Sequence, residues 1–324
     1  MNILGLDIGY SNLKLAYGTS GMTPTELIIP SGAAPEICLP HGIRMTDEGV
    51  LVNVEGERWR IGLPHGRFDQ WTRALHQNYS SAPGYQALFY GALALIEQPR
   101  IDRVVTGLPV AHWQDVKLRQ ALAKKLTGVH AITQDFCVDV LSVEVIPQPL
   151  GAYLDRLWQP GQEAPVLAEG RVLVVDPGFY SVDWIVIEGG ALRQTASGSS
   201  LDAMSVLIQD AVDLIGRELK GQVSPDAIED ALRRGRDDVY LFGDSLTFTP
   251  YIQAAASQVT YRLAERLRES LRRDAGSIDV VILAGGGASY YRDAVMEAFV
   301  RSRVMMAEHP ERVNATGFFY FGEM

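Results

Sequence analysis

Two segments of the chain, residues 7–14 and 176–183, share a pattern in which an aspartate precedes a glycine turn. The first segment is Asp-Ile-Gly-Tyr-Ser-Asn-Leu-Lys and the second is Asp-Pro-Gly-Phe-Tyr-Ser-Val-Asp. An apolar run precedes each segment and alternating apolar residues follow it, which is typical of two strands joined by a turn. Two such hairpins, one in each half of the molecule, could hold the phosphates of a nucleotide between them.

The first segment combines residue types that suit a bound phosphate. Gly9 would let backbone N–H groups approach a phosphate that a side chain would keep away. Ser11 and Asn12 add short hydrogen-bond donors, and Lys14 adds a positive charge for a β- or γ-phosphate. Asp7 lies at the strand end, where it could hold magnesium through the ion's waters. Taken alone, the segment is equally compatible with an ordinary hairpin that has glycine in its turn.

The second segment favours the binding site over the ordinary hairpin. Asp176 and Gly178 repeat the arrangement, and two acidic residues facing a bound triphosphate would fit a metal ion between them. The alternative is an internal duplication that is kept for folding alone. We favour a functional site, because an aspartate next to a small glycine turn occurs in both halves. Asp183 could equally be a structural cap.

Two further segments have residues suited to nucleotide chemistry. Residues 280–288 are expected to form a strand, a triple-glycine turn and a helix start, where a flat ring or ribose could approach and the helix N-terminus would favour an α-phosphate. Gln148 lies between Pro147 and Pro149 and is expected outside regular structure, with an amide free to orient a water molecule. The alternative for Gln148 is a plain helix start.

The elements that must position these residues alternate along the chain. Strands are predicted over residues 50–54, 59–61, 104–108, 138–146 and 279–283, and helices over residues 85–96, 115–126, 151–158, 201–219, 251–273 and 291–300. This alternation predicts an α/β class in both halves. Residues 159–170, rich in Pro, Gly and Glu, are the predicted boundary. Domain I would comprise 1–158 with 302–324, including a smaller subdomain within 18–100, and domain II would comprise 166–301.

Composition limits the classes of partner. The 324 residues are 47% apolar, which suffices for two cores. A net charge of −10 makes direct binding to nucleic acid unexpected, so any link to DNA would need an adaptor. Cys38 and Cys137 have no paired spacing that indicates a disulfide or a zinc site. Because we find neither a signal peptide nor a run long enough to span a membrane, we expect a cytoplasmic protein with no membrane partner.

Other motifs are absent from the sequence or fit it poorly. Residues 11–14 match the S-x-x-K pattern of acyl-transferring serine enzymes, but that motif opens a helix and this one lies in an expected strand. The six histidines lack metal-ligand spacing. Neither a G-x-x-x-x-G-K-[ST] loop nor a G-x-G-x-x-G loop after a strand is present. The arginines at 233, 234 and 236 and from 262 to 273 are expected on solvated helix faces.

The four segments, taken in their order along the chain, resemble the nucleotide site that actins, sugar kinases and heat-shock chaperone ATPases share. More closely, the chain resembles the ParM/StbA group, the actin-like proteins of plasmid segregation. The matching stretches are residues 7–14, 59–62, 108–109, 176–183, 198–201, 282–288 and 314–322.

The resemblance implies two ribonuclease-H-like domains around a central nucleotide cleft, with ATP or GTP and Mg²⁺ as ligands. It also implies hydrolysis coupled to assembly of the protein into filaments, which would segregate plasmid DNA through a DNA-bound adaptor. By position, the metal would be served by Asp7 and Asp176, and catalysis by Asp176 and Gln148. Nucleotide contacts would come from Asp7, Gly9, Tyr10, Ser11, Asn12, Lys14, Gly178, Phe179, Tyr180, Gly285, Gly286, Gly287 and Ala288.

One position departs from the ParM-like pattern, which commonly has glutamate where this chain has Gln148 and actin has glutamine. A glutamine can orient a water molecule but is no base, so we expect slow hydrolysis timed by assembly.

Two other functions fit the same core. A small-molecule kinase would need a base at a substrate pocket, and no additional Asp-bearing loop marks one. A non-motile scaffold of the cell-division or pilus-assembly type usually has a membrane-targeting amphipathic end, which residues 319–324 do not resemble. The sequence does not choose between ATP and GTP.

Overall fold

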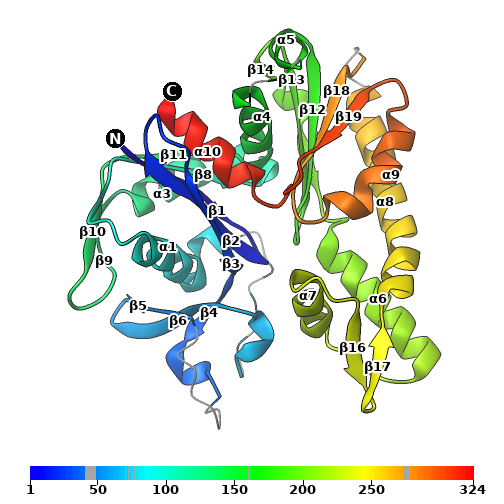
Figure 1. The fold of residues 1–324 in the computed structure, drawn as a ribbon, viewed down its shortest axis with the longest axis horizontal. Coiled ribbons are helices and arrows are strands. Elements are labelled where there is room, and N and C mark those ends of the chain that lie inside the picture. Colours follow the sequence, from blue (N-terminus) through cyan, green and yellow to red (C-terminus); the bar gives the residue numbers. More distant parts are fainter. Residues whose placement is uncertain are drawn as a thin grey trace. The chain divides into compact units, whose positions relative to one another are not determined.

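The computed structural model divides into two units, Met1–Ala164 with Glu308–Met324, and Pro165–Ala307 (Figure 1). It describes residues 1–40, 49–69, 71, 73, 75, 78–159, 161, 163–272 and 277–324. Residues 41–48 of the predicted subdomain and residues 160 and 162 of the predicted boundary lie outside this part. Strands and helices occur in both units, so the predicted α/β class is confirmed.

The central sheet of the first unit has the strand order β11-β8-β1-β2-β3. Its members are β1 (Asn2–Ile8), β2 (Asn12–Thr19), β3 (Thr25–Pro30), β8 (Arg103–Leu108) and β11 (Val143–Pro147). Strands β1, β2 and β3 pair antiparallel, whereas β8 is parallel to β1 and β11 is parallel to β8. The C-terminal ends of β1, β8 and β11 therefore lie at one edge of the sheet, and Asp7 is at this end of β1.

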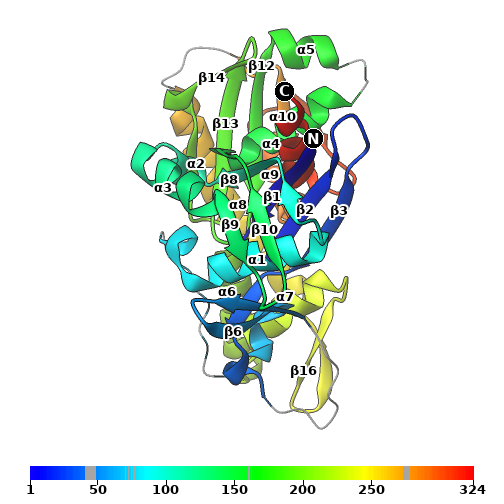
Figure 2. The ribbon, with the colours of Figure 1, turned by 90° about the vertical axis from the view of Figure 1, so that its left-hand side faces the viewer.

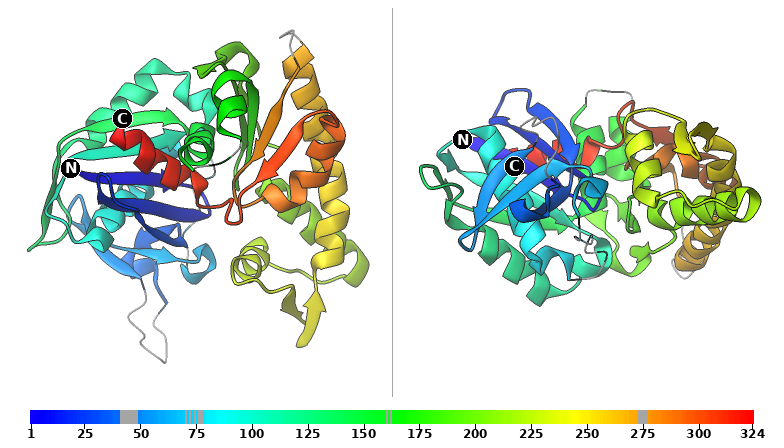
Figure 3. Two further views of the ribbon diagram at one scale, coloured as in Figure 1. Left: turned by 45° about the horizontal axis from the view of Figure 1, so that its top comes forward. Right: turned by 90° about the horizontal axis from the view of Figure 1, so that it is seen from below.

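Alternate residues of β1 serve two different cores. Leu4 and Leu6 are fully buried against α1 (Pro83–Ile96). Ile3, on the other face, packs with Phe319 of α10 (Val313–Glu323), which runs along β1 (Figure 3). Because side chains alternate along a strand, Asp7 shares the face of Ile3.

Smaller sheets complete the first unit. One has the order β4-β6-β5, with β4 (Gly32–Pro35), β6 (Glu57–Leu63) and β5 (Val50–Val54), and α1 lies between it and the central sheet (Figure 1). Another has the order β7-β10-β9, with β7 (Arg100–Ile101), β10 (Cys137–Val140) and β9 (Gly128–Ala131).

The remaining helical segments of the first unit are short. They are η1 (Glu36–Cys38), η2 (His65–Arg67), η3 (Tyr79–Ser81), α2 (Val110–Trp113), α3 (Val116–Leu126) and α4 (Gln148–Trp158). Helices α2 and α3 lie side by side (Figure 2). The Asp115 carboxylate caps α3 by accepting from the N–H groups of Lys117 and Leu118, which explains where this predicted helix begins.

The second unit repeats the pairing pattern of the first. Its sheet has the order β14-β13-β12-β18-β19, and β15 pairs with β13. The strands are β12 (Arg171–Pro177), β13 (Val182–Glu188), β14 (Ala191–Leu192), β15 (Gly198–Ser200), β18 (Val280–Leu283) and β19 (Arg303–Met306). Strand β12, like β1, pairs antiparallel with the next strand and parallel with a later one. The repeat in the sequence therefore corresponds to a repeated topology.

One face of this second sheet is covered by helices. Val175 and Trp184 pack into a core with residues of α6 (Met204–Leu219), α8 (Thr249–Arg272) and α9 (Ala288–Ala298). The other elements are η4 (Gln194–Ala196), α7 (Pro225–Arg233) and the hairpin of β16 (Asp238–Leu241) and β17 (Asp244–Thr247). Helix α5 (Ala164–Glu169) spans the boundary between the two units.

Several predicted elements have different limits in the structure. The single strand over residues 138–146 is wrong, because the chain leaves β10 at exposed Leu141 and enters a different sheet as β11. Helix α6 begins at Met204 rather than at residue 201, and α9 ends at Ala298 rather than at residue 300. Residue 273, the predicted end of the helix now called α8, lies outside the described residues.

Candidate functional site

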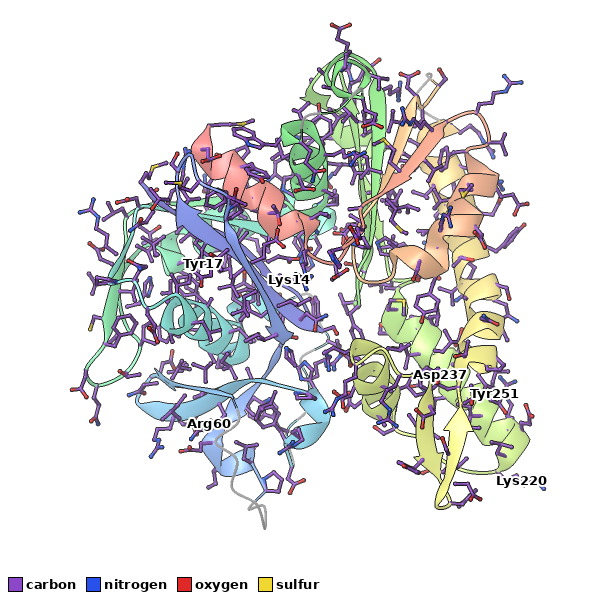
Figure 4. All side chains as sticks on the ribbon, in the orientation of Figure 1. Lys14, Tyr17, Arg60, Lys220, Asp237 and Tyr251 are labelled. Carbon is purple, nitrogen blue, oxygen red and sulfur yellow. The ribbon has the colours of Figure 1, made fainter. Side chains whose placement is uncertain are left out.

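Asp7 is a buried carboxylate with two polar partners. Its side chain is 1% exposed, and in the β1–β2 hairpin it lies opposite Lys14. The Lys14 Nζ donates to Oδ2 at 2.7 Å, and the Gln148 Nε2 donates to Oδ1 at 2.8 Å. Figure 4 shows Lys14 on β2. A buried charge is tolerated when it is paired and hydrogen-bonded in this way. The structure thus brings together three residues that the sequence predicted for the site: Asp7, Lys14 and Gln148.

Gln148 departs from the sequence prediction. It is the first residue of α4 rather than a residue outside regular structure, because Pro149 fits the first turn of a helix. Its amide is also not free, since Nε2 donates to Asp7. The side-chain Oε1 is the atom through which Gln148 could still accept a hydrogen bond from water.

Helix α4 is placed by its contact with α10. A Cβ on Gly317 would overlap the carbonyl oxygen of Gly151 and would lie 2.8 Å from the Gly151 Cα. The two helix backbones can approach so closely only because both positions lack a side chain. The position of Gln148, at the start of α4, therefore depends on this crossing of α4 with α10.

The turn of the first hairpin is closed by a hydrogen bond of 3.0 Å from the Gly9 N–H to the Asn12 carbonyl. The Tyr10 side chain is 8% exposed, and its ring stacks on that of Tyr79 at 4.3 Å between centroids. Ser11 and Asn12 are partly exposed. Any contribution of Tyr10 to ligand binding is therefore best assigned to its main chain.

The second hairpin also has buried aspartates and a turn closed by a backbone hydrogen bond. Asp176 in β12 is 7% exposed and lies opposite Asp183 in β13. The turn is closed by a hydrogen bond of 2.9 Å from the Gly178 N–H to the Ser181 carbonyl. The Asp183 carboxylate accepts hydrogen bonds from the hydroxyls of Ser181, at 2.6 Å, and Ser199. Asp183 thus ties the turn of this hairpin to β15.

The triple-glycine turn lies directly against the second hairpin. Gly285 has a φ of +77°, and a Cβ there would overlap the Oδ1 of Asp176 and lie 2.7 Å from the Pro177 carbonyl oxygen. The Gly287 N–H donates to that same carbonyl at 2.9 Å, and α9 begins at the next residue, the fully buried Ala288. Asp176 and the glycine turn therefore form one site within the second unit.

Two backbone carbonyls in the turn of the second hairpin accept hydrogen bonds from another element, the start of α6. The N–H groups of Met204 and Ser205, at the start of α6, donate to the carbonyls of Gly178 and Phe179 at 3.2 and 2.8 Å. Tyr180 follows Phe179 and is partly exposed. The first turn of α6 therefore fixes the peptide planes of the residues that follow Asp176.

These residues suit a magnesium nucleotide in donor type and packing. Close backbone turns suit phosphate, and buried aspartates suit a hydrated divalent cation. Within the described residues, which exclude His41 and His76, no three acidic, histidine or cysteine side chains cluster as direct metal ligands. Magnesium would thus depend on water and phosphate oxygens for most of its ligands, as is usual for this ion.

One charged cluster was missed by the sequence analysis. Asp202 accepts from the Arg262 Nε at 2.9 Å and from the Ser200 hydroxyl at 2.8 Å, and the Arg266 Nε lies 2.8 Å from its other oxygen. Burial opposes ionisation of this carboxyl, but these partners outweigh it and lower the pKa of Asp202. Arg262 and Arg266 lie exposed on α8, as the sequence predicted, and in addition both pair with Asp202.

Two families match the chain. Residues 5–151 match the actin-like protein N-terminal domain, and residues 174–297 match the C-terminal domain of the archaeal MreB-like actin homologues. The chain is an actin-like protein. Its fold is of the ParM type, as the comparison with solved structures shows.

Three solved structures illustrate this likeness. A non-polymerisable quadruple mutant of pCBH ParM has a TM-score of 0.77 at 17% identity, over 99% of each chain. An archaeal actin homolog in complex with ADP has a TM-score of 0.78 at 19% identity, over 100% of this chain and 99% of that one. A 15-stranded ParM filament from Clostridium botulinum has a TM-score of 0.72 at 16% identity, over 99% of each chain.

A comparison with curated proteins returned no match. Among the described residues, no helix has both the length and the apolar character needed to cross a membrane.

Proposed function

We propose that this protein binds and hydrolyses ATP or GTP with Mg²⁺ and assembles into filaments that segregate plasmid DNA in the cytoplasm through a DNA-bound adaptor. The observation that carries the proposal is a repetition. In each unit, a buried aspartate at the end of the central strand precedes a closed glycine turn. A structural duplication alone would not require a buried charge at both positions, since burying a charge is costly.

The phosphates of the nucleotide would be bound by both hairpins. In the first, the turn of residues 9–12 and the Lys14 ammonium would contact phosphate oxygens. In the second, the amides of Gly178, Phe179 and Tyr180 would do so. The turn of residues 285–287 with Ala288 would lie against the nucleoside, because Gly286 leaves open space where a side chain would stand.

Hydrolysis would depend on orientation rather than on a strong base. Bound magnesium would neutralise part of the phosphate charge, with Asp7 and Asp176 holding its water ligands. Gln148, fixed to Asp7 through its Nε2, would accept a hydrogen bond from the attacking water at Oε1. Because an amide does not take up the proton, we expect slow hydrolysis that becomes faster on assembly.

Self-assembly is supported by solved structures of the same fold, including a 15-stranded ParM filament. The net charge of −10 favours an adaptor over direct contact with DNA. The test is light scattering with pelleting in ATP, GTP and Mg²⁺, with EDTA as the control. We expect polymer only with triphosphate and magnesium. Absence of polymer across a wide range of protein concentrations would contradict the proposal.

A further inference from the structure

The carbonyl groups of the first turn are bound by residues from outside the hairpin. The Ser31 N–H donates to the Ser11 carbonyl at 2.9 Å, and the His65 Nε2 lies 3.2 Å from the Tyr10 carbonyl. The Tyr79 hydroxyl lies 3.4 Å from the Gly9 carbonyl, which is long for a hydroxyl hydrogen bond. Three successive carbonyls thus have partners that come from distant parts of the first unit.

The direction of these carbonyls fixes the direction of the amides. No cis peptide bond occurs among the described residues, and in a trans peptide the N–H points away from the C=O of the same plane. When the carbonyls of residues 9, 10 and 11 point toward Tyr79, His65 and Ser31, the N–H groups of residues 10, 11 and 12 point the opposite way. This is the orientation that a phosphate-binding turn requires, because a carbonyl oxygen would repel the anion.

The partners of the turn also contact the hairpin and one another. The Ser31 hydroxyl lies 3.4 Å from the His65 Nε2, and the Tyr79 ring stacks on Tyr10 with an interplanar angle of 24°. Since a carbonyl only accepts, the His65 Nε2 must carry the proton. Burial, with nearby Tyr85 and Tyr10, raises the pKa of Tyr79, so its hydroxyl stays a donor at ordinary pH.

We propose that His65 and Tyr79 are positioning residues for the phosphate-binding turn of residues 9–12, with His65 the stronger of the two because its contact is shorter. This inference rests on the proposed nucleotide site and adds residues of η2 and η3 to it. A second observation points the same way, since the turn after Asp176 has its carbonyls bound by the first turn of α6.

The test compares four variants. His65→Leu removes the donor, His65→Gln restores an N–H donor at a similar distance from the backbone, and Tyr79→Phe removes the hydroxyl but keeps the stacked ring. Tyr90→Phe is the control, because the Tyr90 hydroxyl accepts a hydrogen bond from Gln86 within α1 rather than bonding to the turn of residues 9–12. Circular dichroism and thermal unfolding establish that each variant folds.

Two measurements are made on each folded variant. The first is the dissociation constant for Mg-ATP and Mg-GTP by calorimetry, and the second is hydrogen–deuterium exchange of the amides at residues 10–12 without nucleotide. We expect His65→Leu to weaken binding about threefold to tenfold and Tyr79→Phe about twofold to fivefold. Both should speed exchange at residues 10–12. His65→Gln should recover most of the loss, which a merely structural role would not predict.

The outcomes separate this inference from the proposed function. If wild-type protein binds nucleotide while His65→Leu and Tyr79→Phe match it in affinity and exchange, the inference is overturned and the proposed function stands. If wild-type protein binds no nucleotide, the proposed function fails, and the positioning role fails with it as a role in binding. If His65→Leu does not fold, the comparison of His65→Gln and Tyr79→Phe with Tyr90→Phe decides in the same way.

Discussion

The side-chain amide of Gln148 donates a 2.8 Å hydrogen bond to Asp7, joining the first residue of α4 to the end of the central strand β1. Lys14 binds the other oxygen of the same carboxylate at 2.7 Å. A residue proposed to orient water and a residue proposed to hold metal-bound water thus share one rigid arrangement. Displacing either one is expected to affect the other.

Replacement of Gln148 by alanine should slow hydrolysis more than it weakens binding. Loss of the oriented Oε1 should lower the hydrolysis rate in assembled protein by about 10-fold to 100-fold. The dissociation constant for nucleotide should stay within about threefold, because Gln148 is not expected to contact the phosphates in the ground state. Phosphate release during assembly measures the rate, with Gln86→Ala on α1 as the control. A wild-type rate for Gln148→Ala in filaments would remove this residue from the mechanism.

Gly285→Ala should destabilise the second unit even without nucleotide. The new Cβ would overlap the Asp176 carboxylate, and the φ of +77° is strained for alanine. We expect a loss of about 2 kcal/mol or more in the free energy of unfolding, measured by urea denaturation. Gly286→Ala is the matched control, because a Cβ at that position would meet no other part of the protein within 4 Å. Equal stability of the two variants would show that the approach of the turn to Asp176 is not tight.

Gly317→Ala tests the helix crossing that places Gln148. Because the added Cβ would overlap the Gly151 backbone, the helices must separate, and we expect a loss of about 3 kcal/mol. Gly84→Ala in α1 is the control, since the nearest atoms to its Cβ lie 3.9 Å away. That substitution should be neutral or stabilise the protein by up to about 1 kcal/mol. A Gly317→Ala protein as stable as wild type would contradict the described packing.

The fold class could be predicted because the strands carry local signals. Runs such as residues 50–54 and 104–108 are apolar, end at turn residues and correspond closely to β5 and β8. The strand over residues 138–146 was wrong because periodicity does not show that the chain changes sheets at Leu141. That change depends on pairing with β7 and β8, which are distant in the sequence.

The site could be predicted only where one segment carries its own chemistry. The two hairpins and the triple glycine are visible as short motifs, and their assignment as ligand contacts stays a prediction. The contacts of His65 and Tyr79 with the first turn span 55 and 70 residues, so no local pattern indicates them. The prolines around Gln148 suggested an irregular segment, but Pro149 instead stabilises the start of α4.

Asp155 should make the protein less stable as the pH rises through the weakly acidic range. Burial, with the negative charge of Glu26, raises the pKa of Asp155 from 3.8 to about 6, against the Gln159 hydrogen bond and Arg156. Between these two values the folded state binds more protons than the unfolded state, so stability falls as pH increases and is constant above about 6. In wild type the free energy of unfolding should fall by about 2 to 3 kcal/mol over this pH range because of Asp155, and Asp155→Asn should remove that fall.

Urea unfolding at pH 4.5 and pH 7 would measure this effect as the difference between wild type and variant, which cancels the other carboxyls to a first approximation. Asp102→Asn is the control. A backbone hydrogen bond from Asn2 and the Arg100 side chain lower the pKa of Asp102. The stability that the ionised Asp102 adds is therefore lost only when the pH falls below the ordinary aspartate pKa of 3.8. Asp102→Asn should therefore lower the free energy of unfolding by a similar amount at pH 4.5 and pH 7. The same pH slope in Asp155→Asn and wild type would contradict the raised pKa.

The central claim is that the two matched aspartate turns serve one magnesium nucleotide, and calorimetric titration of Mg-ATP and Mg-GTP tests it most directly. Wild-type protein should bind one triphosphate per chain, and Asp7→Asn and Asp176→Asn should each weaken that binding by about tenfold or more while the proteins stay folded. No binding to wild type, or full affinity in either folded variant, would contradict the account.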